Sequence, residues 1–130
     1  MTGQPKTVRL EEGRVFTGLG AEVRRLVHPS TVGSKNVGVS ICLMNPGEEI
    51  MTHRHDYEEA YFVVRGSGKM YLEGEPQIQL EPGLSVYIAP GQVHGQVNDG
   101  ADALHILCSL SPPPTEGVTP ELVPVDEDGA

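Results

Sequence analysis

Three histidines and one glutamate have the residue types and the spacing of a metal site. His53 and His55 are separated by one residue, so on a β-strand their side chains leave the same face and can converge on one ion inside a barrel. Glu59 follows four residues after His55, beyond a short turn, and offers a carboxylate oxygen, while His94 brings a third imidazole from a later strand. We therefore predict a metal site made by His53, His55, Glu59 and His94.

The chemistry of these ligands indicates the kind of ion. Three neutral imidazoles and one carboxylate around a divalent cation leave a net charge of about +1, which suits iron, manganese, nickel, zinc, copper or cobalt better than magnesium or calcium. A six-coordinate ion would keep two positions open to water, dioxygen or a substrate, as a closed structural site would not. We predict one divalent transition metal per chain, with iron or manganese favoured.

The elements that must position these residues are short strands. Of 130 residues, 16 are Gly and 11 are Pro, and they separate short apolar or alternating runs, which is typical of an all-β fold. No segment has helical periodicity. Residues 59–65 and 69–73 are expected to form a hairpin around Gly66-Ser67-Gly68. The other predicted strands are 6–10, 22–27, 37–44, 77–80, 85–88, 92–97 and 103–110, with one more around His53 and His55.

Two longer segments contain the four candidate ligands. The first reads Gly47, EEIMT, His53-Arg54-His55, DYE, Glu59, AYFVVR, Gly66. The second reads Gly83, LSVYI, Ala89-Pro90-Gly91, QV, His94, GQV, Asn98. Together they resemble the two motifs of the cupin superfamily, with Ala89 as the one departure, where the family usually has Pro.

The resemblance covers roughly residues 37–110 and is that of a small, single-domain cupin. It implies a cupin double-stranded β-helix, a jelly-roll-like barrel, and it places the metal on the same four residues. Members of the superfamily act as dioxygenases, decarboxylases, isomerases or lyases on small oxygen-bearing molecules. Two functions follow for this chain: a metal-dependent enzyme acting on a carboxylate, keto acid or diol-type molecule, which we favour, or a non-catalytic metal-dependent binding or sensing module.

Four further residues are candidates for the substrate pocket. Tyr61 shares a strand face with Glu59, and Gln92 and Gln96 flank His94 on its expected inward face, where an amide can hold a water or a substrate oxygen. His105 is a candidate to support the metal ligands, although a hydrogen-bonded strand residue is the simpler interpretation. Tyr57 is expected at the barrel mouth rather than inside it, and the sequence identifies no catalytic acid or base.

The chain divides into three parts. Residues 1–36 are expected to form strands that wrap the barrel or a dimer partner, residues 37–110 form the barrel core, and residues 111–130 form a Pro-rich acidic tail. The last residues of the tail are expected to be disordered, while the apolar residues at 122, 123 and 125 can dock on a barrel edge.

Charge and composition limit the partners. The net charge is −9, with all nine basic residues in 1–69, so no basic stripe is available for nucleic acid or an acidic membrane surface. A basic first half, an acidic second half and exposed edge strands favour a homodimer. The N-terminus has no apolar secretory segment, which favours a cytoplasmic protein. Cys42 and Cys108 are interpreted as buried free thiols.

Overall fold

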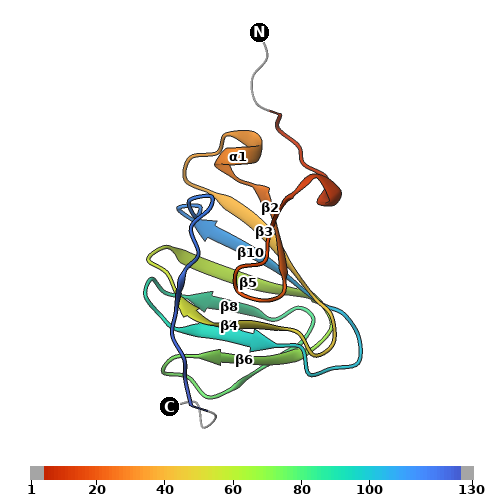
Figure 1. Ribbon diagram of the computed structural model, residues 1–130. Helices are drawn as coiled ribbons and strands as arrows, with labels where there is room; N and C mark the ends of the chain where they lie inside the picture. The colour runs from red at the N-terminus through yellow and green to blue at the C-terminus, as the bar shows by residue number, and fades with distance from the viewer. Residues whose placement is uncertain (1–4, 127–130) are drawn as a thin grey trace.

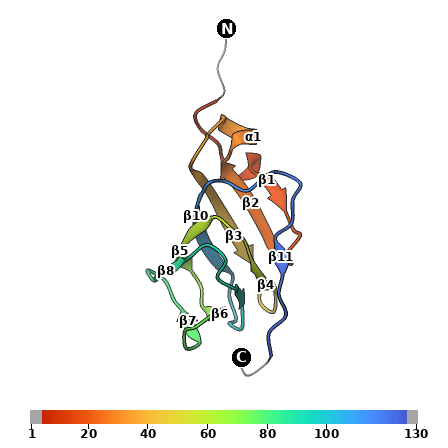
Figure 2. The ribbon, with the colours of Figure 1, turned by 90° about the vertical axis from the view of Figure 1, so that its left-hand side faces the viewer.

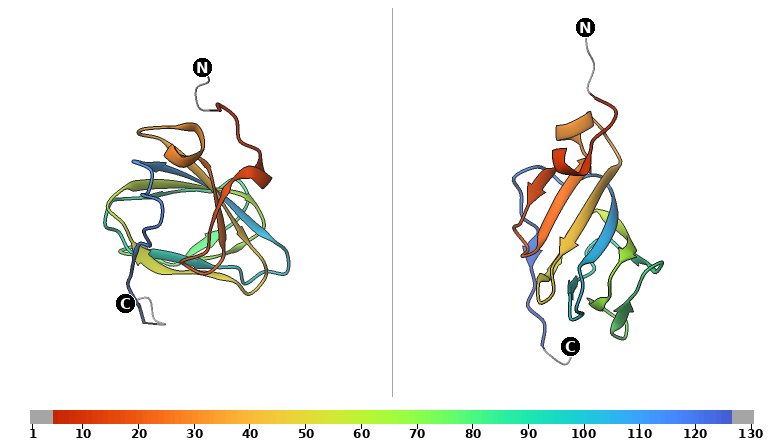
Figure 3. Two further views of the ribbon diagram at one scale, coloured as in Figure 1. Left: turned by 45° about the horizontal axis from the view of Figure 1, so that its top comes forward. Right: turned by 90° about the vertical axis from the view of Figure 1, so that its right-hand side faces the viewer.

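A computed structural model of the protein describes residues 5–126, which form two antiparallel β-sheets facing one another (Figures 1 and 3). The larger sheet has six strands in the order β1-β2-β3-β10-β5-β8. Their bounds are β1 Arg14–Phe16, β2 Glu22–Val27, β3 Gly38–Met44, β10 Leu104–Ser111, β5 Glu58–Arg65 and β8 Ser85–Ile88.

The smaller sheet has five strands in the order β11-β4-β9-β6-β7. Their bounds are β11 Glu121–Leu122, β4 Glu49–Arg54, β9 His94–Val97, β6 Gly68–Leu72 and β7 Ile78–Leu80. Helix is confined to the 3-10 turn η1 (Leu10–Glu12) and the short α1 (Pro29–Val32) in the described part of the chain. Within the same residues, no helix is long and apolar enough to cross a membrane. The predicted all-β, jelly-roll-like barrel is confirmed.

Alternation along the strands places the core between the sheets. Buried and less buried residues alternate along β3, β5 and β10, as expected for strands with one face inward and one outward. The side chains packed completely inside are mostly aliphatic: Met44, Val63, Met70, Leu80, Ile88, Leu104 and Ile106. Their burial supplies most of the hydrophobic stabilisation of the barrel.

Two strand predictions were wrong. Residues 6–10 form no strand, and the first strand of the structure is Arg14–Phe16. The expected hairpin of residues 59–65 and 69–73 is absent because β5 and β6 belong to different sheets. Gly66, with φ +85°, makes the corner against β10, where a Cβ atom would collide with the carbonyl oxygen of Ala103. The chain therefore crosses between the sheets at a point where the sequence suggests a tight return.

A bulge in β4 sets the direction of His53. The register pairs Ile50 with Gln96 and His53 with His94, so two residues of β4 lie opposite the single Gly95 of β9. Without the extra residue, Ile50 and His53 would point to opposite faces, whereas both are buried in the structure. Gly95 permits the close approach, because a Cβ atom there would lie 2.8 Å from the carbonyl oxygen of Ile50.

The segment after β10 crosses from the larger sheet to the smaller one (Figure 2). The carbonyl of Pro114 accepts a hydrogen bond from His28 Nε2 at 2.7 Å, which holds the first part of the segment at the larger sheet. The segment ends at β11, which pairs with β4. The Val123 N–H extends this pairing to the carbonyl of Thr52 at 2.9 Å. Residues 112–122 thus cover one end of the barrel; the disorder expected for the last residues concerns 127–130, which lie outside the described residues.

We expect Gly95→Ala to lower the free energy of unfolding by about 1–3 kcal/mol, because the new methyl group forces the β4 bulge to shift. Chemical denaturation measures this change. The control is Gly38→Ala in β3, where the nearest atom to a new Cβ is the Cβ of Pro113, at 3.2 Å, rather than a backbone oxygen. Equal losses of stability in the two variants would contradict the role given to Gly95.

Candidate metal centre

The four predicted ligands come together between the two sheets. His53 in β4 and His94 in β9 are opposite one another in the smaller sheet, His55 follows β4, and Glu59 projects from β5 of the larger sheet. One nitrogen from each histidine lies within 4.8 Å of the others. Glu59 Oε1 lies 3.0 Å from His55 Nε2 and 3.5 Å from His94 Nε2. The carboxylate thus completes the cluster from the opposite sheet.

Backbone carbonyls orient all three imidazoles. The Nδ1 atoms of His53, His55 and His94 lie 2.7, 2.9 and 2.9 Å from the carbonyl oxygens of Met51, Tyr57 and Gln92. Because a carbonyl oxygen only accepts hydrogen bonds, each Nδ1 must carry the proton, and each Nε2 keeps a lone pair. This arrangement fixes the tautomer that a metal-binding histidine needs.

The Nε2 atoms of His55 and His94 face the Glu59 carboxylate. Among residues 5–126, the buried His94 Nε2 has no hydrogen-bond partner, and Glu59 Oε1 lies 3.5 Å from it. Burial, followed by the charge of His94, lowers the pKa of His53 to about 4, so this imidazole is neutral at pH 7. Burial acts to raise the pKa of Glu59, but interactions with His55 and His94 outweigh it and lower that pKa to about 2. A cluster of acceptors with a carboxylate fits a cation.

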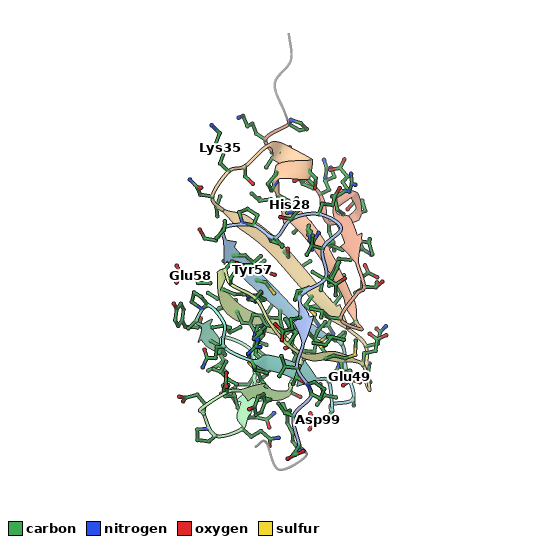
Figure 4. The ribbon with its side chains drawn as sticks, turned by 60° about the vertical axis from the view of Figure 1, so that its left-hand side comes forward. His28, Lys35, Glu49, Tyr57, Glu58 and Asp99 are labelled. Carbon is green, nitrogen blue, oxygen red and sulfur yellow. The ribbon has the colours of Figure 1, made fainter. Side chains whose placement is uncertain are left out.

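His53, His55 and Glu59 form one side of a cavity of about 60 Å³, against roughly 10–15 Å³ for a single water. Tyr61 and Gln96, both expected in the pocket, line it, and the Tyr61 hydroxyl donates to Gln96 Oε1 at 3.1 Å. Tyr57, expected at the mouth, also lines it and stacks on His55 with ring centroids 3.8 Å apart. Figure 4 shows Tyr57 among the strands, with the neighbouring Glu58 at the edge of the barrel.

The two other pocket candidates lie elsewhere. β9 begins at His94, so Gln92 belongs to the preceding turn, where its side chain accepts from Ala89 N–H at 3.0 Å and donates to the carbonyl of Glu73 at 2.8 Å. Its backbone carbonyl, rather than its amide, contacts His94. His105 alternates with the buried Leu104 and Ile106 in β10 and therefore faces outward. Neither side chain lines the cavity beside the proposed ligands.

Several residues of the cavity wall were not predicted. Phe16 and Arg25 reach it from the first two strands, and Pro114 and Pro120 reach it from the segment after β10. Alternation within β2 would have indicated that Val23 and Arg25 share a face, but not which face is inward. Cys42 and Cys108 also line the cavity as buried free thiols, which confirms their interpretation.

Comparisons with known proteins agree with this geometry. Residues 40–110 match the Cupin domain family. The uncharacterized protein MJ1618 of Methanocaldococcus jannaschii is 30% identical over 112 residues, which cover 83% of this chain and 89% of that protein. The polyketide synthase protein CurC of Streptomyces cyaneus is 31% identical over 111 residues, covering 84% of this chain and 71% of that one. The polyketide cyclase RemF of Streptomyces resistomycificus has a similar structure, with a TM-score of 0.72, 20% identity and coverage of 96% and 89%.

We expect His53, His55 and His94 of the metal-free protein to be Nδ1–H tautomers near neutral pH, because their Nδ1 atoms face carbonyl oxygens. Long-range ¹H–¹⁵N correlation spectra distinguish the two tautomers. His105, which has no such carbonyl contact among the described residues, serves as the internal reference. Nε2–H tautomers at any of the three positions would contradict the arrangement of lone pairs.

Proposed function

The chain belongs to the cupin domain family, and from this membership and its site we propose that it is a metal-dependent enzyme acting on a small oxygen-bearing molecule. The substrate would be a carboxylate, keto acid or diol-type compound, and the reaction that of a dioxygenase, decarboxylase or isomerase. Two of the similar proteins are named as a polyketide synthase protein and a polyketide cyclase, which favours an enzyme.

The observation that carries the proposal is that three buried imidazoles lie within 4.8 Å of one another, with the Glu59 carboxylate 3.0 Å from His55 Nε2 and 3.5 Å from His94 Nε2. His53, His55, Glu59 and His94 would hold one divalent transition metal, with iron or manganese favoured because the donor set mixes nitrogen with a hard oxygen. The bound ion would act as a Lewis acid toward an oxygen of the substrate.

The other cavity residues would orient the substrate and exclude water. Tyr61 donates its hydroxyl proton to Gln96, which leaves the amide N–H₂ of Gln96 free to donate to a substrate oxygen. Tyr57 holds the ring of His55 by stacking and through its carbonyl. Pro114 and Pro120 add apolar wall opposite the strands.

One observation favours the alternative, a non-catalytic binding or sensing module. Burial raises the pKa of the cavity phenols Tyr57 and Tyr61, and it raises the pKa of the Cys42 thiol to about 12. Burial also raises the pKa of Cys108. Apart from the proposed ligands, the described cavity residues therefore include no side chain tuned to exchange protons near pH 7.

Elemental analysis of protein purified without a metal-affinity tag tests the metal site. We expect about one iron or manganese per chain in the wild type, because four converging ligands give a preformed site. His94→Ala should lose the metal, since it removes the buried imidazole opposite His53. The outward-facing His105→Ala is the matched control and should keep it. Absence of metal from the wild type, or equal retention in both variants, would refute the proposed site.

An activity screen separates the enzyme from the binding module. Metal-loaded protein is incubated in air with keto acids, dicarboxylates and catechols, while dissolved oxygen and released CO₂ are followed. For the enzyme we expect consumption of oxygen or release of CO₂ that metal-free protein does not reproduce. Saturable binding of a compound without its conversion would support the sensing module instead.

The homodimer and the cytoplasmic location suggested by the sequence remain proposals. Light scattering at micromolar concentration and cell fractionation address them directly.

A further inference from the structure

Arg25 is a buried charge that the metal site does not explain. It lies in β2, lines the same cavity as His53, His55 and Glu59, and is only 6% exposed. Its register partner in β3 is the buried Ser40, and Cys108 and Tyr61 continue the same inward row across β10 and β5. Arg25 therefore points into the barrel from one end of this row, and Tyr61 lies at the other end.

No ion pair or hydrogen bond joins the Arg25 guanidinium to any other group among residues 5–126. The Phe16 ring packs against the guanidinium, with its centroid 4.7 Å from the guanidinium carbon. Glu116 acts on Arg25 only at longer range and pairs with Arg14 at 3.0 Å. Burial lowers the pKa of the Arg25 guanidinium, which nevertheless remains protonated at pH 7, and an anion placed against it would offset this desolvation.

We propose that Arg25 binds a carboxylate of the cavity's ligand, so that the substrate class is a compact dicarboxylate or keto diacid. This inference rests on the proposed function for the other end of the ligand, which the metal would hold. Three strand spacings separate Arg25 from Tyr61, or about 14 Å between their backbones, and both side chains line the cavity. Because this cavity has a volume of only about 60 Å³, a ligand that reaches both Arg25 and the proposed metal must be short.

The wall between the two ends suits a dianion. Ser40, Cys42 and Cys108 lie there and are uncharged, since burial raises the pKa of both thiols. The guanidinium fork matches the two oxygens of a carboxylate, and Phe16 covers one face of the guanidinium, which leaves its edge to the ligand. With the proposed metal bound to Glu59 and the histidines, the cavity would have two cationic ends and a neutral middle.

Isothermal titration calorimetry on the full-length, metal-loaded protein tests this role. The probes are malonate, succinate and glutarate, each compared with its half-amide, which has the same shape and one charge fewer. We expect at least one diacid to bind the wild type about tenfold or more tightly than its half-amide, because the lost contact is a charge-assisted hydrogen bond. Arg25→Gln should abolish this preference without changing the metal content.

Arg24→Gln is the matched control, because Arg24 is the neighbouring residue on the other face of β2, where it pairs with Glu22. It should keep the preference. Arg25→Lys retains the charge without the fork and should reduce the preference partly, and thermal melting followed by circular dichroism checks that each variant folds. If Arg25→Gln does not fold, the wild-type preference and Arg25→Lys decide the question.

The possible outcomes separate this inference from the metal proposal. A wild type that does not prefer any diacid, or a preference that survives in Arg25→Gln, overturns the role of Arg25 while the metal content still supports the metal site. An Arg25-dependent preference in protein that never contains metal supports the carboxylate site and refutes the metal-dependent function.

Discussion

The structure depends on bringing three imidazole nitrogens and one carboxylate together in the interior of the barrel. Buried lone pairs and a carboxylate repel one another and lose their hydration, so the cluster is unfavourable unless a cation joins it. The surrounding backbone holds it in place, since each imidazole is fixed by a carbonyl at 2.7–2.9 Å. The bulge in β4 has the same role, because it turns His53 toward His94. The barrel thus holds the ligands in an arrangement suited to a cation.

The two sequence motifs stabilise each other as well as providing ligands. Asn98, the last residue of the second motif, accepts from Gly47 N–H at 2.8 Å and donates its own N–H to Glu48, at the start of the first motif. Its buried amide also bonds the carbonyls of Met44 and Asp102. At the other end, Gly91 N–H donates to the carbonyl of His55 at 2.7 Å. The other motif residues therefore position the proposed metal ligands.

Local patterns in the sequence were enough to predict the fold class and the clustering of the four ligands, because these depend on turn residues and on alternation over two to four positions. Alternation of inward and outward residues gave wrong predictions where a strand begins or ends at a different residue than expected. Gln92 was placed on the inward face by extending β9 two residues too far, although that strand begins at His94. The glycines around Ser67 resemble the turn of a hairpin between β5 and β6. In the structure these two strands pair instead with strands that are distant in the sequence, and the chain changes sheet at Gly66. Register between distant strands cannot be deduced from short-range patterns.

The charges of the cavity depend even more on long-range contacts. Arg24 and Arg25 are adjacent, and nothing in the sequence distinguishes them. In the structure, Arg24 pairs with Glu22 on the outer face of β2, whereas Arg25 is buried. The difference arises because β2 pairs with β3, which turns Arg25 to the same side as Ser40. Since the thiols and phenols of the wall stay neutral, Glu59, the metal and Arg25 would be the charged groups that face a ligand. With Glu59 occupied by the metal, charge selection in this cavity would favour anions, and the separation of the two positive ends would select among them by length.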